Sequence, residues 1–252
     1  MMVLTKSMIV ARADLRMALK VKFVKYGILA LPALGPIMGI AMIGVPIFLD
    51  PSSFDLIMGY LLPTLSAMLA VFTIIPAAMI SANSFVGERE QNTLEPILCT
   101  PLTDTELLLG KTLSAFLPSM AILAGVTVIT SLGSNVLIVL AGRAPVLIPD
   151  LPGLFLICVV SPVMILATVS VMIIVSGRVS RVYEAYQMVG GIVLIMFIPM
   201  FGSFAGIGTG VPDLNAQWFA NFVTLLIALA LMGVTWVLAW TRFNRDRLVS
   251  LV

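Results

Sequence analysis

The chain has 252 residues, of which 60% are hydrophobic and only 10% are charged, and its mean hydropathy is +1.15. Soluble globular domains carry far more charge, so this composition indicates an integral membrane protein. The net charge of +2 gives no support to a nucleic-acid-binding function. The chain contains no histidine, which excludes histidine-based zinc sites, histidine general bases and histidine proton relays.

Residues 5–25 are predicted to form a helix at the membrane surface. Apolar residues fall near one line of this helix and basic residues near the adjacent line, a pattern that suits contact with anionic lipid headgroups. The apolar line is Met8, Ala11, Leu15, Leu19 and Tyr26, and the basic line is Arg12, Arg16 and Lys20. The alternative is an ordinary charged flank before the first span. Without an A-x-A pattern after Leu49, we expect the segment to be retained rather than cleaved as a signal peptide.

Six stretches are long and apolar enough to cross a bilayer, whose core needs about 20 apolar residues per helix. The predicted spans are residues 27–49, 60–82, 112–141, 154–176, 187–208 and 218–240. Runs of this length are too long for barrel strands, so the predicted fold is an all-α polytopic membrane protein with one transmembrane domain over residues 1–252. Glycines crowd the outer half of the fifth span, which leaves open a broken or re-entrant helix or a flexible loop.

Orientation follows from the distribution of Lys and Arg in the short connecting segments. Of the 14 basic residues, all but Arg143 fall on the side that holds both termini. We therefore expect both termini, and the connection between the second and third spans, to be cytoplasmic. The predicted location is the cell (inner or plasma) membrane.

The connection at residues 84–106 is the one long polar passage in the middle of the chain. Thr93 is a suitable N-cap for a short helix over residues 94–99, and Thr100 and Pro101 end it. Leu94, Ile97 and Leu98 fall at spacings of three and four, so they form a small apolar surface on that helix. Thr103 and Glu106 then have the spacing of a capping box that starts the third span.

A short capped helix with acidic flanks and an exposed apolar surface is suited to docking into a groove of another protein. The passage "GEREQNTLEPILCTPLTDTELLLGK" also resembles the signature of permease subunits in the second class of ABC-type exporters. The matching residues are Gly87, Glu88, Arg89, Glu90, Thr93, Leu94, Glu95, Leu98, Thr100, Pro101, Glu106, Leu107, Leu108, Gly110 and Lys111. The departures are Asn92, where the family usually has glycine, and Pro96; neither disturbs the predicted helix.

The resemblance implies a pore subunit that forms a dimer with itself or with a related permease. It also implies that the short helix couples to separate ABC ATPase subunits, which would hold ATP and Mg. The coupling residues implied are Glu88, Arg89, Glu90, Thr93, Leu94, Glu95, Ile97 and Leu98. Membrane lipids are the other expected partners.

The chain itself lacks the Gly-x-x-x-x-Gly-Lys-Ser/Thr loop that holds nucleotide phosphates. The nearest match is Gly110-Lys111-Thr112, but Thr105 stands where the first glycine is required. We therefore expect this chain not to be an enzyme and to hold no cofactor or metal, with ATP hydrolysis in a partner.

A second cytoplasmic contact is predicted at residues 176–187. Arg178, Arg181 and Glu184 are spaced three apart, as on one face of a helix, and Tyr183 and Tyr186 are amphipathic. The alternative is an interfacial anchor made of basic and aromatic residues. Of the two, the sequence favours the anchor over a docking helix.

Two other function classes fit less well than an ATP-driven permease. A secondary transporter or channel usually has ionisable residues in its spans, and the predicted spans contain none. An intramembrane enzyme would need a base, a nucleophile or a metal cluster in the bilayer. The cargo is not identified, although an interior rich in methionine (16 in the chain) favours an amphipathic or lipid-like substrate.

Overall fold

The computed structural model describes residues 2–49, 52–87, 90, 103–179 and 181–242. Within these ranges the chain is helical and contains no strand. Six helical segments are long and apolar enough to span a membrane. The predicted all-α polytopic fold is therefore confirmed.

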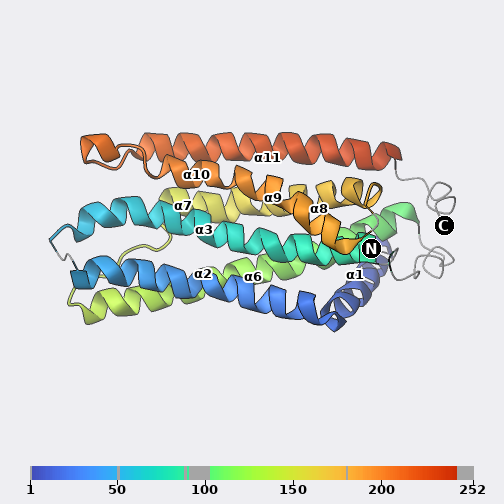
Figure 1. The fold of residues 1–252 in the computed structure, drawn as a ribbon, viewed down its shortest axis with the longest axis horizontal. Coiled ribbons are helices and arrows are strands. Elements are labelled where there is room, and N and C mark those ends of the chain that lie inside the picture. The colour runs from blue at the N-terminus through green and yellow to red at the C-terminus, as the bar shows by residue number, and fades with distance from the viewer. Residues whose placement is uncertain (1, 50–51, 88–89, 91–102, 180, 243–252) are drawn as a thin grey trace.

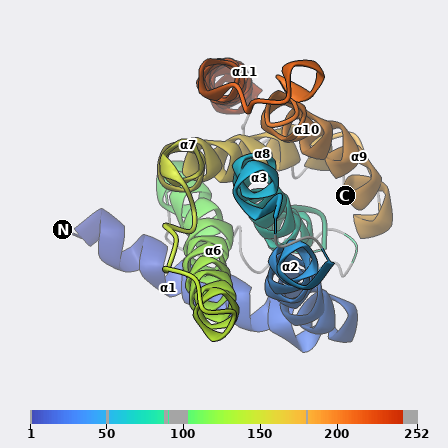
Figure 2. The same ribbon diagram turned by 90° about the vertical axis from the view of Figure 1, so that its left-hand side faces the viewer.

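The first helix, α1 (Met2–Lys20), lies across one end of a bundle of long helices (Figures 1 and 2). A bend at Val21 separates α1 from α2 (Lys22–Leu49). The predicted surface helix over residues 5–25 was thus too long, because Lys22, Lys25 and Tyr26 already belong to α2. In the sequence, these basic residues resemble a charged flank before the first span. In the structure they belong to the helix of that span.

The face of α1 that packs against the protein is made of small and polar residues. Ser7, Ala11, Asp14 and Ala18 are buried, whereas Met8 and Leu19 of the predicted apolar line are exposed. Small side chains let two helices approach closely, and α1 packs mainly against α6. The bundle therefore covers only part of the apolar line: Ala11 is buried and Leu15 is half-buried.

The helix α3 (Phe54–Ala82) lies at the centre of the bundle and contacts α2, α6, α8, α9 and α10 (Figure 2). It continues as a π-helical turn, η1 (Asn83–Gly87), instead of ending at Asn83. Close packing around α3 relies on glycine: a Cβ added to Gly39 of α2 would lie 2.5 Å from Leu65 and 2.9 Å from Thr130.

The next helix, α6 (Asp104–Leu140), begins with the predicted capping box. The Glu106 N–H donates to the Thr103 hydroxyl (3.2 Å), and the Thr103 N–H donates to the Glu106 carboxylate (3.0 Å). The helix starts well before residue 112, where the hydropathy of the sequence placed the third span. Its first two turns are polar enough to resemble a loop in sequence.

The fourth span consists of three pieces: α7 (Leu151–Phe155), a π-helical turn η2 (Leu156–Val160) and α8 (Ser161–Ser176). Asp150 is the N-cap of α7 and accepts a hydrogen bond from the Gly153 N–H (3.1 Å). Burial raises the pKa of the Asp150 carboxyl above its ordinary value, although the hydrogen bond from Gly153 opposes this shift.

The fifth span is broken. It comprises α9 (Val182–Ile195) and α10 (Phe197–Gly202), so the predicted end at residue 208 was too late. A turn and the short 3-10 helix η3 (Ile207–Thr209) follow, with positive φ at Gly206 and Gly210 (88° and 71°). The Asp213 N–H donates to the Ala205 carbonyl (3.4 Å), which closes this loop before α11 (Leu214–Arg242).

The start of α6, η1, the link between α8 and α9, and α1 all lie at the same end of the bundle, which we call the α1 end (Figure 1). The links between α2 and α3 and between α6 and α7 lie at the opposite end. The links between successive spans thus alternate between the two ends of the bundle, as expected for a chain that crosses the membrane an even number of times.

Candidate functional site

The predicted coupling segment joins η1 to α6 at the α1 end. Seven of its predicted residues lie outside the described part of the chain: Glu88, Arg89, Thr93, Leu94, Glu95, Ile97 and Leu98. The structure does describe Glu90 and the residues that hold the two ends of the segment. These flanking residues define the candidate site.

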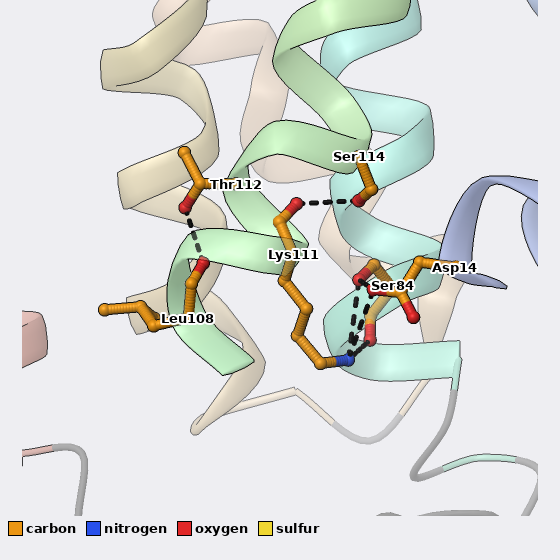
Figure 3. Close-up of polar contacts among 6 residues, drawn as sticks. All are labelled: Asp14, Ser84, Leu108, Lys111, Thr112 and Ser114. Atoms are coloured by element: carbon orange, nitrogen blue, oxygen red, sulfur yellow. Dashed lines mark hydrogen bonds and ion pairs between the residues drawn. The ribbon is translucent and has the colours of Figure 1, made fainter. Parts of the chain in front are cut away.

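A buried ion pair connects α1, η1 and α6. Lys111 Nζ of α6 lies 3.9 Å from Asp14 Oδ2 of α1, and the two side chains are only 5% and 4% exposed. Ser84 of η1 lies between them: its hydroxyl donates to Asp14 Oδ2 (2.7 Å), and Lys111 Nζ donates to its backbone carbonyl (2.5 Å) (Figure 3). We call Asp14, Ser84 and Lys111 the buried triad.

The triad satisfies the conditions under which two charges can be buried. Removing an ion from water costs several kcal/mol unless a partner charge and hydrogen bonds replace the lost hydration. Lys111 has the Asp14 carboxylate, the Ser84 carbonyl and the ring of Phe85, whose centroid is 5.3 Å from Nζ. The arrangement therefore depends on all three elements being in place.

Sequence reasoning missed the triad. Lys111 was assigned to a loop because hydropathy placed the span after it, and Asp14 was not considered because the helix was read from its apolar residues. One signal was available: Asp14 is the only acidic residue before Asp50, and it shares the four-three-four spacing of Ser7, Ala11 and Ala18. An isolated acid on a line of small residues indicates a face that packs against a cation.

Gly110, next to Lys111, allows α1 to approach α6. A Cβ at this position would lie 2.7 Å from Val10 Cβ and 3.0 Å from the Ser7 carbonyl. The Ser7 hydroxyl donates to the Glu106 carbonyl (3.1 Å), and Lys6 Nζ lies 3.6 Å from Glu106 Oε1. The Gly-Lys pair that looked like part of a phosphate loop is thus a site of helix packing.

The other side of the segment contacts α9. Glu90 Oε2 accepts a hydrogen bond from the Val182 N–H (3.0 Å), where a carboxylate is favoured by the helix dipole. Asn83 Nδ2 of η1 donates to the Tyr186 hydroxyl (2.5 Å). Two passages that the sequence analysis singled out separately, residues 84–106 and 176–187, are therefore adjacent.

The shared helical face predicted for Arg178, Arg181 and Glu184 is not present in the structure. Arg178 lies in the turn after α8, Arg181 is the N-cap residue of α9, and Glu184 is in the first turn of α9. The three side chains do not share a face of one helix, because the helix begins only at Val182. All three side chains are nevertheless exposed.

The described contacts hold the two ends of the segment in place. Within the described ranges, no group of three or more His, Cys, Asp and Glu side chains could hold a metal ion. These contacts tie Ser84, at the start of the segment, and Lys111, after its end, to each other and to α1.

The structure is that of a multi-pass helical membrane protein in which contacts hold both ends of the polar segment between the second and third spans. This architecture is expected of a transporter membrane domain. The family model of ABC-2 family transporter proteins matches residues 5–216. The chain belongs to this family and is a permease subunit of an ABC transporter. A search of curated proteins found no match to the chain.

Proposed function

We propose that the chain forms the translocation pathway of an ATP-driven exporter as a dimer, with the segment at residues 84–106 coupled to separate ATPase subunits. The observation that carries this proposal is the buried triad. Ser84 is the first residue of the segment and Lys111 follows its end, so a force applied to the segment reaches η1, α6 and α1 together. ATP and Mg are assigned to the partner ATPase, since Lys111 is engaged by Asp14 and Ser84.

Sidedness is the next part of the proposal. The α1 end is cytoplasmic, because it carries the basic residues of α1, the start of α2, and Arg178 and Arg181. The opposite end has Arg143 as its basic residue among the described positions, with Asp55, Asp150 and Asp213. Both termini are then cytoplasmic, and the coupling segment faces the ATPase.

The link between α8 and α9 supplies a second contact with the ATPase. Glu90 connects the coupling segment to the Val182 N–H at the start of α9. Arg178, Arg181 and Glu184 are exposed beside this hydrogen bond. A partner that docks on the coupling segment would therefore meet these charged side chains as well.

The cargo is amphipathic or lipid-like. The half-buried residues of α3 are mainly apolar: they are Ile57, Leu61, Met68, Val71, Phe72 and Ile75, together with Gly59 and Tyr60. An apolar lining favours a substrate with acyl or aromatic groups over a hydrated ion. The direction of transport is outward, as the exporter signature implies.

The test measures the ABC ATPase that co-purifies with the tagged chain from membranes of its own cell. Leu98→Glu is expected to reduce the recovered ATPase at least about tenfold, because it removes roughly 1.5–3 kcal/mol of leucine burial and puts a charge in the groove. Gln91→Glu is the matched control and should leave recovery unchanged, and Glu95→Ala should reduce it less.

Equal membrane expression and ATP turnover of the complex are recorded across the set. Recovery of wild-type amounts of ATPase with Leu98→Glu, or no ATPase with the wild-type chain, would contradict the proposal. So would ATP turnover by the isolated chain.

A further inference from the structure

An open groove runs between α1 and α6 on the side of α1 that faces away from the buried triad. Its volume is about 480 Å³, within the range of about 300–1,000 Å³ typical of small-molecule sites. The walls are mainly apolar and are formed by Met8, Ile9 and Leu15 of α1 and by Leu113, Leu117 and Pro118 of α6. Met8, Ile9 and Leu117 are 49%, 66% and 44% exposed, so the bundle leaves these walls uncovered.

A single basic residue, Arg12, also lines this groove. Its side chain is exposed, and within the described part of the chain no carboxylate forms an ion pair with it. The only acidic residue of α1, Asp14, is turned inward to Lys111, and the nearby Lys6 pairs with Glu106. The exposed side of α1 therefore presents Arg12, Arg16 and Lys20, and none of the ion pairs among the described residues neutralises them.

An apolar groove with an uncompensated cation fits a ligand with an acyl chain and an anionic headgroup. The groove opens where α6 enters its candidate span, Thr105–Leu140, so acyl chains are its natural surroundings. A protein partner would require a larger contiguous surface than this groove provides. A zwitterionic lipid would leave Arg12 beside an ammonium group as well as a phosphate.

We propose that this groove is a binding site for an anionic phospholipid, with one acyl chain between α1 and α6 and the headgroup phosphate at Arg12. The lipid comes from the leaflet that adjoins α1 and fixes the position of α1 against α6 from outside, opposite the buried triad. The proposal does not rest on ATPase coupling, so the two can fail separately.

The first experiment is native mass spectrometry of the purified full-length chain with phosphatidylglycerol and with phosphatidylcholine of the same acyl chains. We expect preferential retention of phosphatidylglycerol. Arg12→Gln should weaken its binding about fivefold, the effect of about 1 kcal/mol for one basic residue near a charged headgroup. Arg16→Gln removes the same charge from the same helix but does not line the groove, so it should have a smaller effect.

The second experiment locates the acyl chain. Phosphatidylglycerol with a photoactivatable acyl chain should label residues 113–118 of α6, and Leu117→Trp should abolish this labelling by filling the groove. Val128→Trp places the same side chain at an exposed position of α6 outside the groove and is the control for folding.

Three results of these two experiments would overturn the proposal. They are equal retention of the two lipids, equal losses for Arg12→Gln and Arg16→Gln, and labelling confined to residues outside the groove. Disulfide-linked dimers through Leu117→Cys, in a chain with Cys99 and Cys158 replaced, would show that a second copy covers the groove and would also reject the lipid.

Discussion

Asp14 and Lys111, which come from the first helix and the third span, form an ion pair of 3.9 Å in the interior of the protein, with the Ser84 hydroxyl bonded to the same carboxylate oxygen. The pair closes a loop in the chain that contains the whole coupling segment. The sequence predicted α1 only as a helix at the membrane surface. The ion pair and the Ser84 hydrogen bond fix α1 to η1 and α6, which carry the two ends of the coupling segment.

Replacing one member of this pair should be more damaging than replacing both. Lys111→Met leaves the Asp14 carboxylate buried without its cation, which typically costs about 3–5 kcal/mol. Asp14→Asn combined with Lys111→Met removes both charges while retaining an acceptor for Ser84, and should recover most of the lost stability. The measurement is unfolding of the purified chain in detergent, followed by helical circular dichroism.

A matched comparison within α6 tests the close approach of α1. Gly110→Ala should lower stability by about 1–3 kcal/mol, because the new methyl group overlaps Val10 and the Ser7 carbonyl. Gly125→Ala, on the same helix with nothing within 4 Å of an added Cβ, should be neutral or stabilising by up to about 1 kcal/mol. Similar behaviour of the two variants would mean that α1 does not pack against Gly110.

Asp150 gives a pH-dependent prediction. Because burial raises the pKa of its carboxyl, the unfolded chain loses this proton first as the pH rises above about 3.9. The free energy of unfolding therefore decreases with rising pH until the pH exceeds the pKa of Asp150 in the folded chain. Above that pH it stays at the lower value. Asp150→Asn keeps an N-cap acceptor without the charge and should not show this fall.

At neutral pH, Asp150→Asn should be at least as stable as the wild type, whereas Asp150→Ala should lose about 1 kcal/mol with the cap. Denaturant titrations at a series of pH values distinguish these outcomes. A wild-type chain that becomes more stable relative to Asp150→Asn as the pH rises would show that the sign is wrong.

Sidedness can be measured in intact cells with a membrane-impermeant maleimide, using a chain in which Cys99 and Cys158 are replaced. Asp213→Cys, in the exposed loop before α11, should be labelled from outside, and Gln91→Cys should not. The reverse pattern would place the coupling segment outside the cell and remove the basis for ATPase docking.

The parts of the fold that sequence predicted are those with a local signal. The six long apolar runs and the Thr103–Glu106 capping box each depend on residues that are close together in the sequence, and the structure confirms both. The buried triad joins three distant segments, and hydropathy alone places Lys111 in a loop. The π-helical turns η1 and η2 and the break at Met196 depend on packing around the helix, so they have no comparable signature.

The enclosure of α3 restricts how the membrane domain can move. Because α3 contacts α2, α6, α8, α9 and α10, it cannot slide or tilt alone without opening gaps against several neighbours, and tightly packed interiors resist such gaps. A displacement of Gly87 would therefore move the whole bundle as one rigid body. If the chain acts as the proposed dimer, the movement would be concentrated at the interface between the two subunits.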